Sequence, residues 1–240
     1  HTHPCKYKAS STAAITPIQF CEKYCQYVDE GYTDVIHVPI NRSGSSTYNN
    51  AVMAQGMLRE ERPEHHLNIH LLDPHTYSMV FGWYLCEMAR KLQNGAELRH
   101  VISEFETQMN KMEIILGPYS LKQMKKSGRI SAAAAVMGEL MGIRPIITLI
   151  DGKTGVESKV RGDDKVIPAM IDLCKKRAEG VEDFDYMIGH TSIPQAAELE
   201  KACRKAFGKA PLTTFNLGGV VSANTGPDTL ALVYVGKARD

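Results

Sequence analysis

Residues 34–50, DVIHVPINRSGSSTYNN, contain the transition that decides the fold class. Residues 34–40 form a near-continuous apolar run, which is typical of a strand buried on both faces of a parallel sheet. A loop with three serines, a glycine and a threonine follows, and a helical pattern then extends from about Tyr48 to Glu61. The stretch therefore predicts a strand, a hydroxyl-rich loop and a helix, which is the repeating unit of an α/β fold.

The hydroxyl-rich loop has two physical explanations. Ser and Thr are common N-caps, because their side-chain oxygens accept backbone N–H groups at a helix start. A helix start also leaves N–H groups unpaired and carries partial positive charge, so it favours a carboxylate or a phosphate. Taken alone, the loop is consistent with both a cap and an anion-binding site.

Strands and helices alternate along the rest of the chain. Before residue 111, helical patterns cover residues 16–30, with Thr16 as the expected N-cap, and residues 78–94 and 97–109, and a strand pattern covers residues 67–72. This alternation predicts a mainly parallel sheet flanked by helices. We expect it to form a first α/β domain, residues 1–111.

The pattern changes in the second half. Apolar runs at residues 146–150 and 156–160 flank the turn DGKTG and predict a hairpin, hence antiparallel pairing. An alanine-rich run predicts a helix that ends at Gly142, and residues 213–221 predict a strand leading into a second loop rich in Gly, Ser and Thr. We therefore expect a second α/β domain, residues 112–240, with a mixed sheet packed by helices.

The composition of the 240 residues is that of an ordinary globular protein, with 43% hydrophobic and 23% charged residues. The net charge of +1 gives no electrostatic case for nucleic acid, and no stretch approaches the ~20 apolar residues of a membrane span. The six cysteines contain no C-x-x-C pair, and Cys21 and Cys25 have no second ligand pair in the sequence. We expect reduced thiols in a cytoplasmic protein that needs no metal and no cofactor.

Five segments resemble the DegV family, in the order in which that family has them. The first is the strand, serine-rich loop and helix around the opening stretch, and the second is the turn after the next strand. The third is a Gly-Arg-Ile-Ser segment followed by a strand, and two short segments come later. They are GYTDVIHVPINRSGSSTYNNA (31–51), LLDPHTYSMVFG (71–82), LKQMKKSGRISAAAAVMGELMGIRPII (121–147), VRGDDK (160–165) and SANTGPDTLAL (222–232), and the resemblance covers residues 9–237.

The resemblance implies a function. DegV proteins bind a long-chain fatty acid between two α/β domains, and many are the carrier subunit of a bacterial fatty acid kinase. This chain would then be a lipid-binding carrier and not itself an enzyme. Its ligand would be the fatty acid, and its partner would be the catalytic subunit of the kinase, which phosphorylates the presented carboxylate.

The resemblance also implies which residues hold the carboxylate. One hydroxyl of the family falls on Ser45, and a second, from an upstream Thr-Ser segment, falls on either Ser11 or Thr12. Two positions depart from the family: Ser46 stands where Gly is usual, and Asn224 stands where His is frequent. Because Asn donates a hydrogen bond but carries no charge, we expect a proton-linked part of binding to be lost. The family also begins with a strand that precedes this sequence, so we expect the first domain to lack it.

Two arginines and five apolar residues complete the expected site. Arg129 and Arg161 match arginines that the family uses near its kinase-facing surface, although ordinary surface arginines, one of them capping a helix, would give the same pattern. We expect the second domain to line the fatty acid's tail. The candidates, each equally consistent with plain core, are Met137, Leu140, Met141, Ile143 and Ile146.

The main alternative is a serine-dependent hydrolase or acyltransferase acting on lipids or esters. The segment GSSTY is not a G-x-S-x-G elbow, and no spacing pairs His37, His75 or His190 with Ser45. A phosphate or nucleotide binder is a third class, but the chain has neither the P-loop nor the dinucleotide glycine motif. The sequence therefore favours the carrier.

Overall fold

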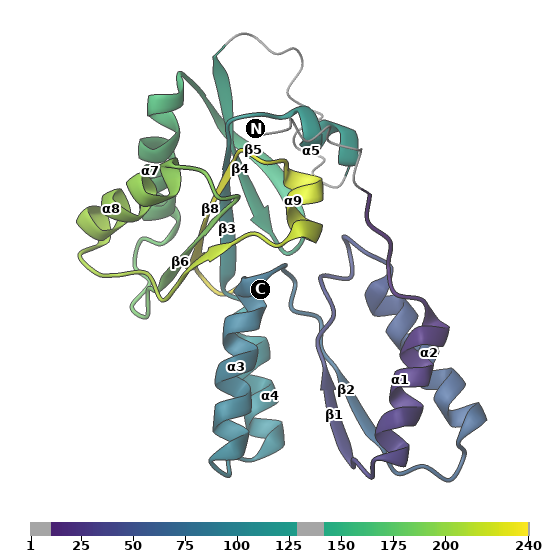
Figure 1. The fold of residues 1–240 in the computed structure, drawn as a ribbon. Coiled ribbons are helices and arrows are strands. Elements are labelled where there is room, and N and C mark those ends of the chain that lie inside the picture. Colours follow the sequence, from purple (N-terminus) through teal and green to yellow (C-terminus); the bar gives the residue numbers. More distant parts are fainter. Residues whose placement is uncertain (1–10, 129–141, 240) are drawn as a thin grey trace, which may run out of the picture.

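The structure, a computed structural model, describes residues 11–128 and 142–239. These residues form a small parallel sheet and a larger mixed sheet, both packed by helices (Figure 1). The predicted α/β fold class is therefore confirmed. The smaller sheet belongs to the early part of the chain and the larger sheet to the later part.

The smaller sheet pairs strands β1 (Asp34–His37) and β2 (Asn68–Leu71) in parallel. Helices α1 (Pro17–Asp29) and α2 (Thr47–Glu61) pack against each other beside it (Figure 1). The α1 helix begins at the predicted cap, where the Thr16 hydroxyl accepts the N–H of Gln19 and the Gln19 side chain accepts the N–H of Thr16. The buried residues of this part are Phe20, Cys21, Tyr24, Cys25, Ala51, Ala54, Leu58 and Leu67.

Strand β1 is shorter and less buried than the apolar run at residues 34–40 predicted. It ends two residues before Pro39, which has no N–H to donate to a neighbouring strand. Its residues are exposed or half-buried because, in the described chain, β2 is its one neighbour. Both faces are still in partial contact, Val35 with the α1–α2 side and Ile36 with the core of the larger sheet.

The larger sheet has the strand order β5-β4-β3-β8-β6-β7. All neighbours are antiparallel except β6 and β7, so the sheet is mixed, and β4 and β5 form the predicted hairpin. The central strands β3 and β8 are buried along their whole length. The strands are β3 (Met112–Pro118), β4 (Ile143–Ile150), β5 (Lys153–Arg161), β6 (Tyr186–His190), β7 (Thr214–Asn216) and β8 (Thr229–Val235).

Helices α7 (Val166–Arg177) and α8 (Gln195–Phe207) cover one face of the larger sheet (Figure 1). Successive residues of a strand point to opposite faces, so Ile115 of β3 and Tyr234 of β8 enter this layer. Both side chains are fully buried. This face is therefore closed by core packing.

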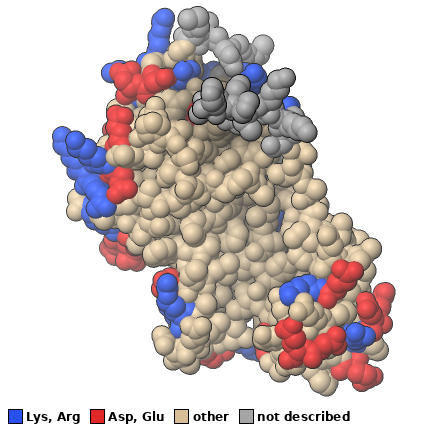
Figure 2. All heavy atoms as spheres, viewed as in Figure 1, with Lys and Arg blue, Asp and Glu red and all other residues tan. Residues whose placement is uncertain are grey.

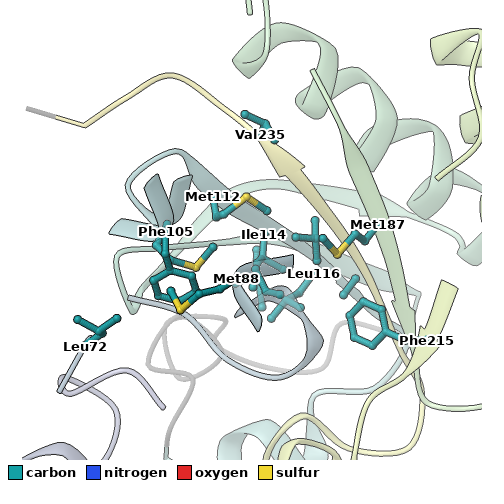
Figure 3. Packing of buried hydrophobic residues seen from close by; sticks show 14 of the residues in the cluster. Leu72, Met88, Phe105, Met112, Ile114, Leu116, Met187, Phe215 and Val235 are labelled. Atoms are coloured by element: carbon teal, nitrogen blue, oxygen red, sulfur yellow. The ribbon is translucent and has the colours of Figure 1, made fainter. Parts of the chain in front are cut away.

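Helices α3 (Met79–Gln93) and α4 (Leu98–Met109) pack against the other face of the larger sheet. Figure 3 shows Met88 of α3, Phe105 of α4 and Ile114 of β3 together in this layer. Both helices precede residue 111, yet their buried side chains belong to the core of the larger sheet. A domain boundary at residue 111 stays a prediction.

The predicted strand at residues 213–221 is in fact a strand followed by a helix. Edge strand β7 stops at Asn216, and helix α9 (Gly219–Thr225) follows. The β-branched pair Val220 and Val221 favoured a strand, but strand propensity depends on an available sheet neighbour. The chain leaves the sheet edge after β7, so these residues take the helical conformation.

Two short helices complete the later part of the described chain. Helix α5 (Lys122–Ser127) packs beside α9, and the 3-10 helix η1 (Asp163–Lys165) directly precedes α7. The alanine-rich helix predicted to end at Gly142 falls outside the described residues. Within the described ranges, no helix has the length and apolarity needed to span a membrane.

A buried charged network attaches α7 to the centre of the larger sheet. The Glu113 carboxylate on β3 is almost fully buried and accepts bonds from Arg177 Nε at 2.6 Å and from the Tyr234 hydroxyl at 2.5 Å. The bond to Glu113 raises the pKa of Arg177, and burial together with the same carboxylate raises the pKa of Tyr234. Arg177 is therefore the cation that compensates the buried Glu113 charge.

We expect Arg177→Ala to lower the free energy of unfolding by about 3 kcal/mol, because it leaves the Glu113 charge buried without its cation. Arg204→Ala is the matched control, since Arg204 pairs with Glu200 on the exposed side of α8 and its loss should cost less than about 1 kcal/mol. Chemical denaturation followed by circular dichroism measures both changes. Equal losses would mean that the Glu113 network contributes no more than a surface ion pair.

Candidate functional site

A cavity of about 340 Å³ is lined by both parts of the fold. Its polar lining comes mainly from the segment before α1 and from the loops after β1 and β2, and its apolar lining from the larger sheet and α9. Apolar walls with a few convergent polar groups are the usual form of a small-molecule site. The lining residues are Thr12, Ala13, Ala14, Ile40, Gly44, Ser45, Ser46, Thr47, Tyr77, Ser78, Val80, Ile114, Leu116, Leu149, Phe215, Leu217, Val220, Val221, Asn224, Thr225, Ala231 and Val233.

The cavity has an uncharged lining. None of the described residues that line it is Lys, Arg, Asp or Glu. On the face of the molecule in Figure 2, charged side chains likewise gather towards the periphery, and uncharged residues fill the middle. A bound anion would therefore meet hydroxyl, amide and backbone N–H donors in place of a countercharge.

The polar loops meet because β1 and β2 are parallel neighbours, whose carboxyl ends lie at the same edge of a sheet. Ser45 and Ser46 follow β1 and precede α2, whereas Tyr77 and Ser78 follow β2 and precede α3. Thr12 reaches the same cavity from the segment before α1. Two helix starts and the segment before α1 therefore converge on one site.

The Ser45 hydroxyl lies at the start of α2. Its oxygen accepts the N–H of Thr47 at 3.2 Å and lies 2.7 Å from the Thr47 hydroxyl. Ser46 occupies the N-cap position, but its side chain makes no capping bond. Ser45 therefore pairs one N–H at the helix start, as a cap would, and also lines the cavity, so the two explanations of the serine-rich loop are compatible.

Tyr77 and Ser78 are cavity residues that the sequence analysis missed. Ser78 has φ 62° and ψ −149°, a backbone conformation that residues other than Gly rarely adopt and that concentrates at ligand sites. Burial, and to a smaller extent the charge of Asp73, raises the pKa of Tyr77, so its hydroxyl stays a hydrogen-bond donor. The signal was available: a serine at the helix start after the second parallel strand occupies the position equivalent to Ser45.

Gly44 allows the two loops to pack against each other. A Cβ atom at this position would lie 1.8 Å from the Tyr77 hydroxyl oxygen. No real contact is that short, so any larger residue would displace either the Tyr77 ring or the serine-rich loop. The glycine is needed here for close approach.

The structure brings together four of the five predicted carboxylate-binding residues. Thr12, Ser45, Ser46 and Asn224 all line the cavity, and Ser11 is exposed outside the lining. The Asn224 amide donates to the Val220 carbonyl at 2.8 Å within α9. Positions 12, 45 and 224 therefore converge, with Thr12 the better placed of the two alternatives in the first segment.

The predicted tail residues are distributed differently. Ile143 and Ile146 lie on β4 but do not line the cavity, and Ile146 is fully buried in the core beneath α7. Leu149 of the same strand lines the cavity, because residues an odd number of positions apart point to opposite faces of a strand. Met137, Leu140 and Met141 fall outside the described residues.

Of the two predicted partner-facing arginines, the structure describes Arg161, which does not line the cavity. Arg161 is exposed at the end of β5, paired in register with Ile143 at the far end of the hairpin from its turn. Arg129 falls outside the described residues. Neither position is tested by the geometry of the cavity.

The turn of the β4–β5 hairpin joins the two parts of the fold beside the cavity. Asp151 Oδ1 lies 2.6 Å from His75 Nδ1 in the loop after β2. Gly152 has φ 71°, and a Cβ atom there would lie 2.3 Å from Asn41 Nδ2 and 2.4 Å from Ser43 Oγ in the serine-rich loop. The hairpin turn is therefore in direct contact with both polar loops.

The three histidines considered as possible bases, His37, His75 and His190, make their described bonds away from Ser45. His37 Nδ1 lies 2.6 Å from the Tyr24 hydroxyl, His75 bonds Asp151, and His190 Nδ1 accepts the N–H of Ser192. A serine nucleophile needs a base within hydrogen-bond reach. For Ser45, the described bonds are those to Thr47, which cannot serve as a base.

The family model described as uncharacterised proteins of the DegV family matches residues 3–237. The chain belongs to the DegV family. A DegV domain-containing protein of Clostridium perfringens is 29% identical over 230 residues, which cover 94% of this chain and 77% of the relative. A DegV domain-containing protein of Staphylococcus aureus is 28% identical over 224 residues, covering 91% of this chain and 75% of the relative.

Solved DegV-type structures have the same fold. A stearic acid-binding protein from Eubacterium ventriosum superposes with a TM-score of 0.82 at 21% identity, covering 94% of this chain and 78% of that one. A fatty acid-binding DegV family protein from Streptococcus agalactiae gives 0.81 at 25% identity, covering 97% and 81%. The names of both proteins state that they bind fatty acids.

We expect Gly44→Ala to lower the free energy of unfolding by about 1–3 kcal/mol, because the added methyl overpacks against Tyr77. Gly56→Ala is the control: a Cβ atom there meets nothing within 4 Å in α2, so it should raise the same free energy by about 0.5–1 kcal/mol. Denaturant titration of both variants shows whether the free energy of unfolding falls or rises. A stable Gly44→Ala protein would show that the two loops can separate without cost.

Proposed function

We propose that this DegV protein binds a long-chain fatty acid in the cavity, with the carboxylate held by the hydroxyls of Thr12, Ser45 and Ser46. The observation that carries the proposal is the division of the lining into hydroxyl-rich loops and an apolar wall. The fatty acid ligands in the names of the Eubacterium and Streptococcus structures support the same chemistry. Binding a fatty acid in this way requires no cofactor.

The polar loops suit a carboxylate. Burying a carboxylate without partners costs several kcal/mol, and the lining offers no Lys or Arg among its described residues. The start of α2 carries partial positive charge, and the Ser45 hydroxyl, whose oxygen accepts the Thr47 N–H, can donate its own hydrogen to a ligand. Asn224 would contribute through its amide, without a charge.

The apolar wall suits an acyl chain. Ile114, Leu116, Ala231 and Val233 of the central strands line it, together with Leu149 of β4. Each buried CH₂ group contributes roughly 0.8 kcal/mol, so a long chain gives most of the binding free energy and the hydroxyls fix its direction. The volume of about 340 Å³ is within the common range of ligand cavities.

We further propose that the chain acts in the cytoplasm as the carrier subunit of a fatty acid kinase and has no catalysis of its own. The resemblance to kinase carriers and the bonding of His37, His75 and His190 away from Ser45 support this proposal. Arg129 and Arg161 would then belong to the surface that meets the kinase. A serine-dependent hydrolase remains the alternative outcome of the tests below.

Organic extraction of the purified protein, followed by mass spectrometry, tests the central proposal. We expect one long-chain fatty acid per chain. Extraction of no lipid, combined with turnover of ester substrates, would favour the hydrolase and contradict the carrier.

We expect Ser45→Ala and Thr12→Ala each to weaken fatty acid binding about ten- to a hundredfold, because each removes one hydrogen bond to a charged group. Ser11→Ala is the matched control, since Ser11 lies outside the lining and should leave the affinity unchanged. Titration with a fluorescent fatty acid measures all three. Ser45 also accepts the Thr47 N–H, so its variant should lose about 1 kcal/mol of stability as well. Unchanged affinity in Ser45→Ala would reduce Ser45 to a cap.

We expect the chain alone to form no acyl phosphate from ATP and bound fatty acid. With the kinase subunit added, Arg161→Ala should slow acyl phosphate formation and leave bound lipid nearly intact, because Arg161 is exposed outside the lining. The defect should shrink as salt rises, since surface charges act mainly on association. Acyl phosphate formed without the kinase would overturn the carrier assignment. If Arg161→Ala forms acyl phosphate as fast as wild type at every salt concentration, Arg161 is an ordinary surface residue.

A further inference from the structure

Two buried cysteines of α1 face the end of α2. Cys21 and Cys25 are four residues apart, so they lie on the same side of the helix, and both are at most 7% exposed. Glu61 is the last residue of α2, and its exposed carboxylate reaches this pair from the rim of the α1–α2 contact. The fold thus adds a third ligand-type side chain that the spacing of the cysteines did not predict.

The three ligand atoms are close together. The Cys21 Sγ, the Cys25 Sγ and a Glu61 carboxylate oxygen all lie within 4.8 Å of one another, and Cys21 Sγ donates to Glu61 Oε2 at 3.6 Å. Around tetrahedral Zn²⁺, with bonds of about 2.3 Å to sulfur and 2.1 Å to oxygen, the sulfur–oxygen separation would be about 3.6 Å and the sulfur–sulfur separation about 3.8 Å. The distance from Cys21 Sγ to Glu61 Oε2 already has the value expected around zinc. The two sulfur atoms would need to approach each other by at most about 1 Å to reach theirs.

We propose that Cys21, Cys25 and Glu61 form a binding site for one Zn²⁺ ion, with the fourth position open to water. Two thiolates and a carboxylate are a donor set that zinc accepts and that harder cations such as Mg²⁺ do not favour. Each thiol gives its proton to solvent when its sulfur–zinc bond forms. The site would link α1 to α2, the two helices that pack beside the smaller sheet. None of its three residues lines the cavity.

Zinc titration of the reduced, full-length protein against a chromophoric chelator tests the site, with metal content after desalting as a second readout. We expect one Zn²⁺ per chain. Co²⁺ loading should give a sulfur-to-cobalt charge-transfer band and the intense visible bands of a tetrahedral centre. These measurements need no fatty acid and no kinase, so they are independent of the proposed carrier function.

Variants separate the site from other ligands on the chain. Cys21→Ser and Cys25→Ser should each weaken zinc binding more than about 100-fold, since loss of an outer-shell partner alone costs about 10- to 100-fold. Glu61→Gln should weaken it and shift the cobalt spectrum, whereas Glu60→Gln and Cys86→Ser, which keep all three ligands, should change neither. Because Glu61 is exposed, its variant should fold even if a buried serine does not. Absence of zinc uptake, or uptake unchanged by Glu61→Gln, would overturn the proposal.

Discussion

The parallel pairing of β1 with β2 is the constraint on which the rest of the site depends. It places the loops after both strands at one edge, so that two helix starts face the same cavity. An antiparallel pair would have sent the loops to opposite ends. The close contact of Gly44 with Tyr77 and the unusual backbone of Ser78 both follow from packing two polar loops into one small space.

The larger sheet provides the apolar wall of the cavity with one face and packs against helices with the other. One face of β3 and β8 is filled by α7 and α8, with the Glu113–Arg177–Tyr234 network holding the layer in register. The other face is only partly covered by α3 and α4, and the remaining apolar strip forms the cavity wall. A central strand can therefore pack in the core with one face and line the cavity with the other.

Local patterns predicted the elements well and the side-chain destinations less well. The cap at Thr16, the β4–β5 hairpin and the α/β fold class follow from short-range chemistry, and the structure confirms them. Whether Ser11 or Thr12 reaches the cavity, and whether Ile146 or Leu149 faces it, depends on a single residue of register. The proximity of Glu61 to Cys21 spans 40 residues of chain and exists only after α1 and α2 have packed. Periodicity carries no information on such pairs.

The turn of the β4–β5 hairpin limits how this chain can vary. Hairpin tips are normally where insertions and circular permutations are tolerated, because they are exposed and touch nothing. Here Gly152 lies directly against Asn41 and Ser43, and Asp151 is paired with His75. An added residue would separate the two polar loops from the sheet that completes the cavity. Length changes during divergence should therefore be rare at this tip and more frequent in the exposed turn near Gly180.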